Sequence, residues 1–288
     1  DLVEAYLARN SLDYLMGFNI SPVLWQRLRG AAKSAGRVQS PALRLVVDRE
    51  IEIEKFKSEE YWTISADFKD ENDNIVQANL SLFDQKKVEK FSFQNSEETN
   101  ITASDLEKKE YRVTSVTSQK RNRNPYAPFT TSTLQQSAST NLKISPRDVM
   151  STAQKLYEAG LITYMRTDGI EMASEGIASA RKQISSSLGE DFLPEKPRVF
   201  KNKAKNAQEA HECIRPTDFS QTPEKAKTLN KSELDLYTLI WRRALASQSR
   251  AAEVLQTTVL ISSSCNSAQF RLSGQVVTFE GHLKIFQD

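Results

Sequence analysis

The stretch Gly160–Gly169, GLITYMRTDG, governs the interpretation of this chain. It places Tyr164 two residues before Arg166, between an expected helix end and an expected turn. The alternation of side chains predicts a short extended segment with Ile162, Tyr164 and Arg166 on one face. A phenol beside a fixed cation can attack a phosphodiester, and the cation then stabilises the charge that develops. Alone, such a pair is more often a packing tyrosine beside a solvated arginine, so the rest of the sequence decides between the two.

Helical patterns surround this stretch on both sides. The residues Ser145-Pro146-Arg147-Asp148 are typical of a helix start, with a capping serine and a proline in the first turn. Gly160 is typical of a helix end. Apolar periodicity predicts further helices over 175–188 and 232–249. Residues 121–250 are therefore expected to form a helical domain that carries the tyrosine.

Strand-like composition flanks this helical domain. Alternating and β-branched residues predict strands at 61–68, 75–83, 111–117, 255–261, 269–272 and 276–285. A turn is expected at Asp70–Asn74 and a loop at 95–100. The economical interpretation is one β-domain, 57–120 with 251–288, into which the helical domain is inserted through two neighbouring connections. Such a block can swing as a rigid unit on a paired hinge.

The first 56 residues predict helices, so the expected fold class is a multidomain α+β protein. Gly17 is expected to end a first helix and Ser21-Pro22 to begin a second. Another helix is expected from Ser40-Pro41. The small-residue loop before it, Ser34–Ser40, leads to free amides and a helix dipole that favour an anion.

Composition narrows the class of protein. The 288 residues suffice for two or three domains, and the net charge of +2 does not by itself indicate nucleic acid. Cys213 and Cys265 lack metal-binding spacing and fit a reducing cytoplasm. No apolar run approaches the roughly 18 residues of a membrane span. Because the chain starts with Asp1 and a helical pattern, we expect a fragment of a longer protein.

Two further clusters suit phosphate groups. His211 and Arg215 would share a face if their segment is helical, although Pro216 places Arg215 at a frayed end. The alternative is a surface histidine paired with a nearby carboxylate such as Glu212. The stretch Ser118–Ser132 combines three cations with aromatic and hydroxyl residues, and either follows a phosphate backbone or is a solvated linker.

Four motifs in this order resemble those of the type IA DNA topoisomerases, and most closely the bacterial topoisomerase I group. They are SAGRVQS at Ser34–Ser40, NPYAPFTTSTLQQ at Asn124–Gln136, GLITYMRTD at Gly160–Asp168 and HECIRPT at His211–Thr217. The resemblance implies the gated architecture of that family. It also implies cleavage and rejoining of one DNA strand through a 5′-phosphotyrosine, which relaxes negatively supercoiled DNA by strand passage without ATP. The implied setting is a monomer in the cytoplasm, associated with the nucleoid and not with a membrane.

The resemblance implies a role for each matching residue. Tyr164 would be the nucleophile, Arg166 would steady the phosphate, and His211 would assist positioning or proton traffic at the scissile region. Cys213 stands where a small residue is expected, which is a mild departure from the family pattern. The implied residues of the single-stranded DNA groove and the scissile phosphate are Arg9, Asp13, Phe18, Ser34, Arg37, Gln39, Thr163 and Arg215.

The family also uses a Toprim domain, whose Asp-x-Asp-x-Glu motif holds Mg²⁺ and whose glutamate lies near the leaving 3′ oxygen. This sequence contains no such motif, since Asp70–Asn74 has the wrong pattern. We therefore expect Mg²⁺ to serve the full enzyme through Toprim, with no metal bound by this segment. The segment alone is expected to bind single-stranded DNA without relaxing supercoils.

Two rival interpretations stay open at the level of sequence. Tyrosine recombinases and type IB enzymes form a 3′-phosphotyrosine, but they place their arginines and a His-x-x-Arg motif before a late tyrosine. Here the tyrosine comes first and the spacing is His-x-x-x-Arg. The second rival is a non-catalytic module that binds single-stranded DNA with the same fold.

Overall fold

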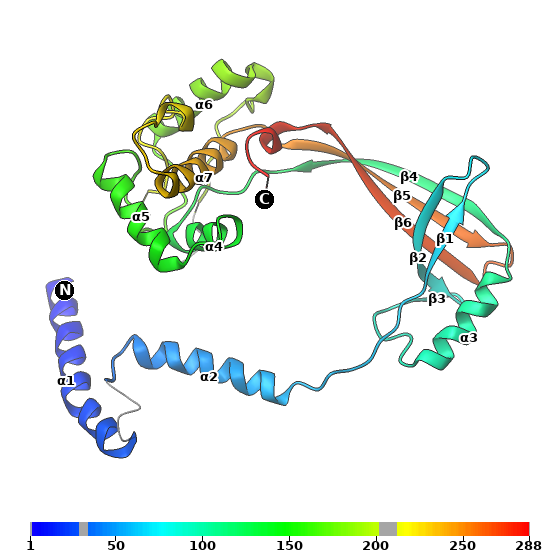
Figure 1. Ribbon diagram of the computed structural model, residues 1–288, viewed down its shortest axis with the longest axis horizontal. Helices are drawn as coiled ribbons and strands as arrows, with labels where there is room; N and C mark the ends of the chain where they lie inside the picture. The colour runs from blue at the N-terminus through cyan, green and yellow to red at the C-terminus, as the bar shows by residue number, and fades with distance from the viewer. Residues whose placement is uncertain (1, 29–33, 202–211, 288) are drawn as a thin grey trace. The chain divides into compact units, whose positions relative to one another are not determined.

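The computed structural model describes residues 2–28, 34–201 and 212–287 as helices and an antiparallel sheet, an α+β arrangement (Figure 1). The chain divides into two compact units. The first comprises residues 1–62 and 90–101, and the second comprises residues 63–89 and 102–288. None of the described helices is both long and apolar enough to cross a membrane.

The first unit contains helices α1 (Leu2–Leu28) and α2 (Gln39–Lys55). Helix α1 runs unbroken through Gly17 and Pro22, so the predicted helix end and the predicted new start are wrong. One glycine inside a helix costs about 1 kcal/mol relative to alanine, which is too little to end a long helix. Ser21 does not cap a helix, because its buried hydroxyl accepts the backbone N–H of Ala35 at 3.1 Å.

Helix α3 (Ser96–Glu107) stands where a loop was expected at 95–100. The side chain of Asn95 accepts the backbone N–H of Glu98 at 2.8 Å, which is the geometry of a helix cap. Only Thr99 and Leu106 are buried along this helix. So few buried side chains leave no apolar period in the sequence, and the capping chemistry was the available signal.

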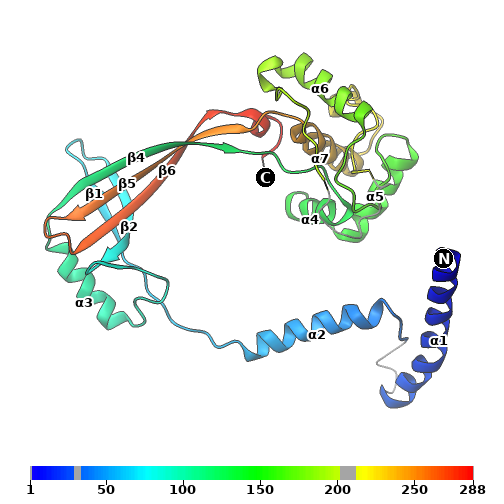
Figure 2. The ribbon, with the colours of Figure 1, turned by 180° about the vertical axis from the view of Figure 1, so that it is seen from behind.

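The sheet in the second unit is antiparallel throughout, in the order β1-β2-β6-β5-β4, with β3 paired to β2. Figure 2 shows the long strands β4, β5 and β6 side by side. The strands are β1 (Ser65–Lys69), β2 (Ile75–Phe83), β3 (Lys86–Lys87), β4 (Tyr111–Arg123), β5 (Ala252–Ser263) and β6 (Ala268–Phe279).

The sheet confirms the predicted turn and changes three predicted strands. The Asp70 carboxylate accepts the backbone N–H groups of Asn72 and Asn74, each at 2.8 Å, which closes the turn between β1 and β2. Strand β1 begins only at Ser65. Strand β6 continues through Gly274, where two strands were predicted, because pairing with β5 supports the backbone across the glycine.

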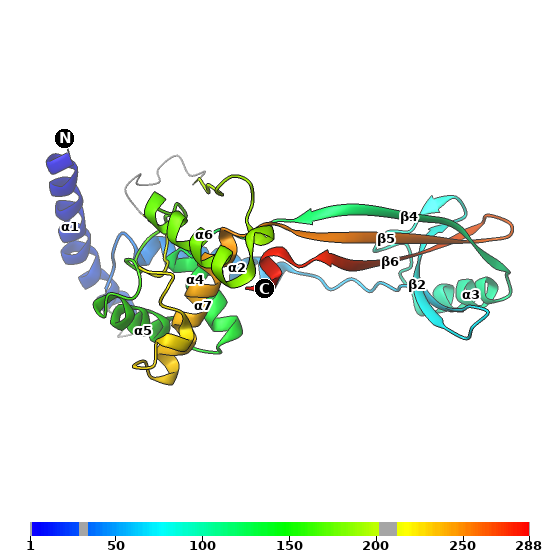
Figure 3. The same cartoon turned by 90° about the horizontal axis from the view of Figure 1, so that it is seen from above.

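Strands β4 and β5 pair with each other (Figure 3), and four α-helices lie between them among the described residues. Helix α7 packs against the other three. Three of these helices share a hydrophobic core, in which Leu134, Val149, Leu156 and Ile240 are almost fully buried. The helices are α4 (Thr131–Asn141), α5 (Pro146–Glu158), α6 (Ser174–Leu188) and α7 (Lys231–Ser247).

Both predicted ends of α5 are confirmed. The Ser145 hydroxyl accepts the backbone N–H of Asp148 at 3.2 Å at the start. Gly160 follows the helix with a φ of +71°, in the left-handed region that glycine tolerates. Its N–H donates to the Tyr157 carbonyl at 2.8 Å, and the Leu161 N–H donates to Leu156 at 2.9 Å. These two bonds form a Schellman motif, which sends the chain directly into the tyrosine loop.

Candidate active site

The loop after Gly160 has buried side chains that include Ile162 and Met165, and exposed ones that include Tyr164 and Arg166. Ile162 and Met165 are each only 1% exposed and belong to the helical core. Tyr164 is 50% exposed, and Arg166 is exposed as well. The segment is not a strand, since Ile162 forms only an isolated bridge to Pro216. The prediction that Ile162 shares a face with Tyr164 and Arg166 is therefore wrong, whereas Tyr164 and Arg166 are both exposed.

The backbone before Tyr164 is held by the segment around Arg215. The Thr163 N–H donates to the Arg215 carbonyl at 2.9 Å, and the Thr163 hydroxyl donates to the Cys213 carbonyl at 2.7 Å. The Arg215 N–H donates back to the Thr163 hydroxyl oxygen at 3.0 Å. On the far side of Ile162, the Thr217 N–H donates to the Leu161 carbonyl at 3.0 Å. Four hydrogen bonds thus fix the chain immediately before the tyrosine.

The backbone after Tyr164 is held by the first residue of α4. The Thr131 hydroxyl lies 2.7 Å from the Met165 carbonyl oxygen and 2.8 Å from the Thr167 nitrogen. The Thr131 N–H donates to the Thr167 carbonyl at 2.9 Å. Tyr164 and Arg166 therefore project from a loop whose backbone is held by hydrogen bonds both before and after Tyr164.

An aromatic neighbour orients the Tyr164 ring. The ring of Tyr157, on α5, meets it edge to face, with centroids 5.3 Å apart and an interplanar angle of 66°. This is a favoured aromatic geometry, and it leaves half of the Tyr164 side chain accessible. The phenol is thus oriented without being buried.

The described residues Glu212–Arg215 do not form the helix end considered for this segment. His211 lies outside the described residues, and the following residues form isolated bridges, Glu212 with Glu171, Ile214 with Phe129 and Pro216 with Ile162. Extended backbone is favoured at Arg215 because this residue precedes a proline. Three neighbouring segments supply the hydrogen bonds of this extended stretch. The shared face of His211 and Arg215 is conditional on a helix, which the described residues Glu212–Arg215 do not form.

Arg215 points into the protein, and its side chain is only 6% exposed. Its Nε donates to the Glu212 carboxylate at 2.6 Å, and a terminal nitrogen donates to the Pro216 carbonyl at 2.9 Å. The same Glu212 oxygen accepts the Ala173 N–H at 2.8 Å, just before α6. A Cβ at Gly176 would lie 2.6 Å from the Arg215 Nε, so a larger residue there would displace the Arg215 side chain. Arg215 thus joins the tyrosine loop to α6, and its predicted contact with the scissile phosphate stays a prediction.

The remaining predicted DNA-binding residues lie in the first unit. Arg37 and Asp13 form an ion pair of 2.6 Å, which brings two of them together. The Ser34 hydroxyl donates to the Gln39 side chain at 3.2 Å, which joins two more. Arg9 is exposed on α1.

Phe18 is also in the first unit and is exposed on α1. It stacks on Tyr14 with ring centroids 4.4 Å apart and an interplanar angle of 28°. An exposed stacked pair offers a flat aromatic surface on which a base can stack.

Sequence reasoning did not single out Thr131 or Gly176, and it considered Glu212 only as a partner for His211. Thr131 lies within the motif Asn124–Gln136, close to two other threonines and a serine, and nothing in the sequence tells which hydroxyl bonds to the helix and which to the loop. Glu212 and Gly176 matter only through Arg215, whose burial the sequence did not indicate.

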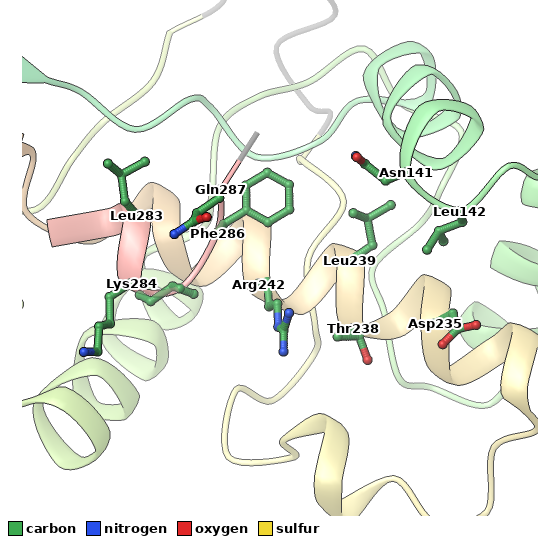
Figure 4. Close-up of a pocket in the computed structure, with 11 residues that line it drawn as sticks. Asn141, Leu142, Asp235, Thr238, Leu239, Arg242, Leu283, Lys284, Phe286 and Gln287 are labelled. Atoms are coloured by element: carbon green, nitrogen blue, oxygen red, sulfur yellow. The ribbon is translucent and has the colours of Figure 1, made fainter. Parts of the chain in front are cut away.

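A pocket of about 440 Å³ lies elsewhere in the second unit. It is lined by α7 residues including Asp235, Thr238 and Arg242, together with the end of α4 and the segment 283–287 (Figure 4). None of its lining residues belongs to the tyrosine loop, so it is separate from the candidate site.

The described part of the chain contains no cluster of possible metal ligands. No group of three or more histidine, cysteine, aspartate or glutamate side chains gathers there in metal-binding geometry.

The two cysteines are expected to differ sharply in reactivity. Burial raises the pKa of the Cys213 thiol to about 12, whereas hydrogen bonds from Ser267 and Ser263 lower the pKa of the exposed Cys265 thiol to about 7. Because the thiolate is the reactive form, iodoacetamide at pH 7.5 should alkylate Cys265 alone in the native protein. Peptide mass spectrometry measures this, and the rate should fall as the pH drops below 7. A Cys265→Ser variant is the control. Equal native labelling of both thiols would contradict the burial of Cys213.

Comparisons with known proteins agree along the whole chain. A family model described as DNA topoisomerase matches residues 1–288. DNA topoisomerase 1 of Zymomonas mobilis is 49% identical over 100% of this chain and 23% of that protein. DNA topoisomerase 1 of Rickettsia felis is 42% identical over 100% of this chain and 38% of that protein.

A solved structure extends the likeness to the fold. Full-length topoisomerase I from Thermotoga maritima matches with a TM-score of 0.80 and 32% sequence identity, over 99% of this chain and 46% of that one. The chain thus spans less than half the length of the relatives that it matches.

Proposed function

Since the chain belongs to the type IA DNA topoisomerase family, and within it to the bacterial topoisomerase I group, we propose that it supplies the nucleophile with which a topoisomerase cuts one DNA strand. The observation that carries the proposal is the tyrosine loop. Tyr164 and Arg166 are both exposed on a backbone held by hydrogen bonds on either side. Holding reacting groups in place in this way removes much of the entropic cost of the reaction.

The chemistry follows from the two side chains. The Tyr164 oxygen attacks the scissile phosphorus, a tyrosine O–P bond forms, and the bond from phosphorus to the 3′ oxygen breaks. The phenol loses its proton, the departing 3′ oxygen gains one, and the 5′ phosphate stays on the protein. Arg166 stabilises the charge on the phosphate during transfer. Attack by the 3′ hydroxyl reverses the step and reseals the strand without ATP.

The proposal extends to the rest of the chain. The six matching residues of the first unit, Arg9, Asp13, Phe18, Ser34, Arg37 and Gln39, bind the single strand that leads to the site. The substrate of the full-length protein is negatively supercoiled DNA, relaxed by strand passage. The helices between β4 and β5 form a domain of 121–250 that moves on the β-domain of 57–120 and 251–288. Thr163, Arg215 and His211 act at the scissile phosphate.

The proposed setting completes the assignment. The full-length protein acts as a monomer in the cytoplasm, and its Mg²⁺ and the acid for the leaving 3′ oxygen come from a Toprim domain. These points rest on the resemblance of the four motifs.

Mapping the covalent adduct tests the proposal. The full-length protein that contains these 288 residues is incubated with single-stranded oligonucleotides labelled at one end or the other, and the complex is trapped by denaturation. Digestion and peptide sequencing should place the nucleotide on Tyr164, joined to the 5′ side of the break. An adduct on another side chain, or a 3′-phosphotyrosine, would refute it.

The isolated 288-residue segment should bind single-stranded oligonucleotides weakly but leave supercoiled plasmid unrelaxed. Its sequence carries cationic and aromatic groups for the strand, but not the Asp-x-Asp-x-Glu motif that the family uses for Mg²⁺. Fluorescence anisotropy measures binding, which should weaken as salt rises. Agarose gels measure relaxation. Robust Mg²⁺-dependent relaxation by the pure segment would contradict this prediction.

A further inference from the structure

We propose that Thr131 is a positioning residue that aims Arg166 at the phosphate attacked by Tyr164. The inference rests on the function proposed above and adds a residue to it. Thr131 itself is the first residue of α4 and does not need to touch DNA for this role.

A single hydroxyl binds both peptide groups next to Arg166. The Thr131 oxygen lies 2.7 Å from the Met165 carbonyl oxygen, to which it donates, and it accepts the Thr167 N–H at 2.8 Å. These two groups belong to the peptide bonds directly before and directly after Arg166. Their rotation sets the direction in which the Arg166 side chain leaves the backbone. The hydroxyl therefore controls the orientation of the arginine from both sides.

The Thr131 hydroxyl is not required for capping its own helix. The cap of α4 is Thr130, whose hydroxyl accepts the Thr133 N–H at 3.3 Å. The Thr133 hydroxyl returns a bond by accepting the Thr130 N–H at 2.9 Å, which completes a capping box. The neighbouring threonines thus serve the helix, and Thr131 serves the loop.

The support on which Thr131 sits is rigid. Phe129 precedes α4, Leu134 and Ala138 lie within it, and all three are at most 1% exposed. Met165 is buried in the same core cluster. The hydroxyl and the loop are therefore fixed to one packed body, from which the side chain of Arg166 reaches solvent.

Three variants of the full-length protein test this role. Thr131→Val keeps the shape but removes donor and acceptor, Thr131→Ser keeps both, and Thr238→Val is the matched control. The Thr238 hydroxyl also donates to a backbone carbonyl at 2.7 Å, that of Leu234, but lies outside the tyrosine loop. Single-turnover cleavage of a labelled single-stranded oligonucleotide gives the rate, and anisotropy gives the dissociation constant.

We expect Thr131→Val to lower the cleavage rate by about 10- to 100-fold, the size of effect that misplacing a reacting group by about 1 Å produces. The dissociation constant should change by less than about two-fold, because the DNA contacts remain. Thr131→Ser should restore the rate, and Thr238→Val should keep it. Thermal melting of each variant verifies the fold, and Thr131→Ala replaces the valine variant if that one does not fold.

A double-mutant cycle with Arg166→Ala separates positioning from general support of the fold. If Thr131 acts through Arg166, adding Thr131→Val to Arg166→Ala should lower the rate no further. Independent losses that multiply would overturn the inference. So would a wild-type rate for Thr131→Val, or equal losses of rate and affinity. An adduct that maps to Tyr164 in each of these cases would leave the proposed function intact, whereas an adduct elsewhere removes the function itself.

Discussion

Tyr164→Phe should abolish covalent attachment of DNA, with a loss of at least about 1,000-fold in the cleavage rate of the full-length protein. The substitution removes only the hydroxyl of a half-exposed side chain, and the phenyl ring keeps its contact with Tyr157. Stability should therefore change by no more than about 0.5 kcal/mol. Denaturing gels of the trapped complex measure the rate, and thermal melting measures the stability.

Tyr157→Phe is the matched control for this experiment. It removes a hydroxyl from the other ring of the same edge-to-face pair. We expect its cleavage rate to stay within about two-fold of wild type, because packing is retained and no bond to phosphorus depends on it. A residual adduct in Tyr164→Phe, or a collapse of the rate in Tyr157→Phe, would move the nucleophile away from Tyr164. A module that only binds DNA would be indifferent to both changes.

Arg215→Ala should destabilise the protein by about 3 kcal/mol, the lower end of the range for breaking a buried ion pair. The lower end applies because the Glu212 side chain is 30% exposed, although that of Arg215 is only 6% exposed. Removal of the guanidinium also leaves the Pro216 carbonyl without its donor. Urea unfolding followed by circular dichroism measures the loss.

Arg215→Lys and Arg166→Ala give the comparison. Lysine keeps the charge but cannot bond to Glu212 and Pro216 at the same time in the geometry of a guanidinium, so it should recover only part of the stability. Arg166→Ala should leave the stability within about 0.5 kcal/mol, since Arg166 is exposed. If Arg215→Ala melted normally and lost only DNA affinity, the phosphate contact implied by the resemblance would be its main role.

The features predicted correctly from sequence are those determined by a few adjacent residues. Hydrogen bonds to backbone groups at most five positions away form each of these features, namely the Ser145 cap, the Gly160 helix end and the Asp70 turn. Because these hydrogen bonds are local, the residues that form them can be recognised in the sequence. The family motifs are equally visible, since each is a short continuous run.

The features that sequence reasoning missed depend on partners far along the chain. Ser21 looks like a cap but serves Ala35, and Ile162 alternates with Tyr164 but is drawn into the core beside Pro216. In each case a tertiary contact outweighs the local pattern. Thr131 is the sharpest example, because only its surroundings distinguish it from the threonines on either side.

The ladder between β4 and β5 ends with Arg123 facing Ala252, and all of α4–α7 falls between these two residues. Facing residues of antiparallel strands have Cα atoms about 5 Å apart. The β4–β5 pair therefore requires only that the two ends of the inserted helical segment lie close together. A short hairpin turn could close the gap and leave a bare sheet for study, and another compact body with adjacent termini could be grafted there without disturbing the strand register.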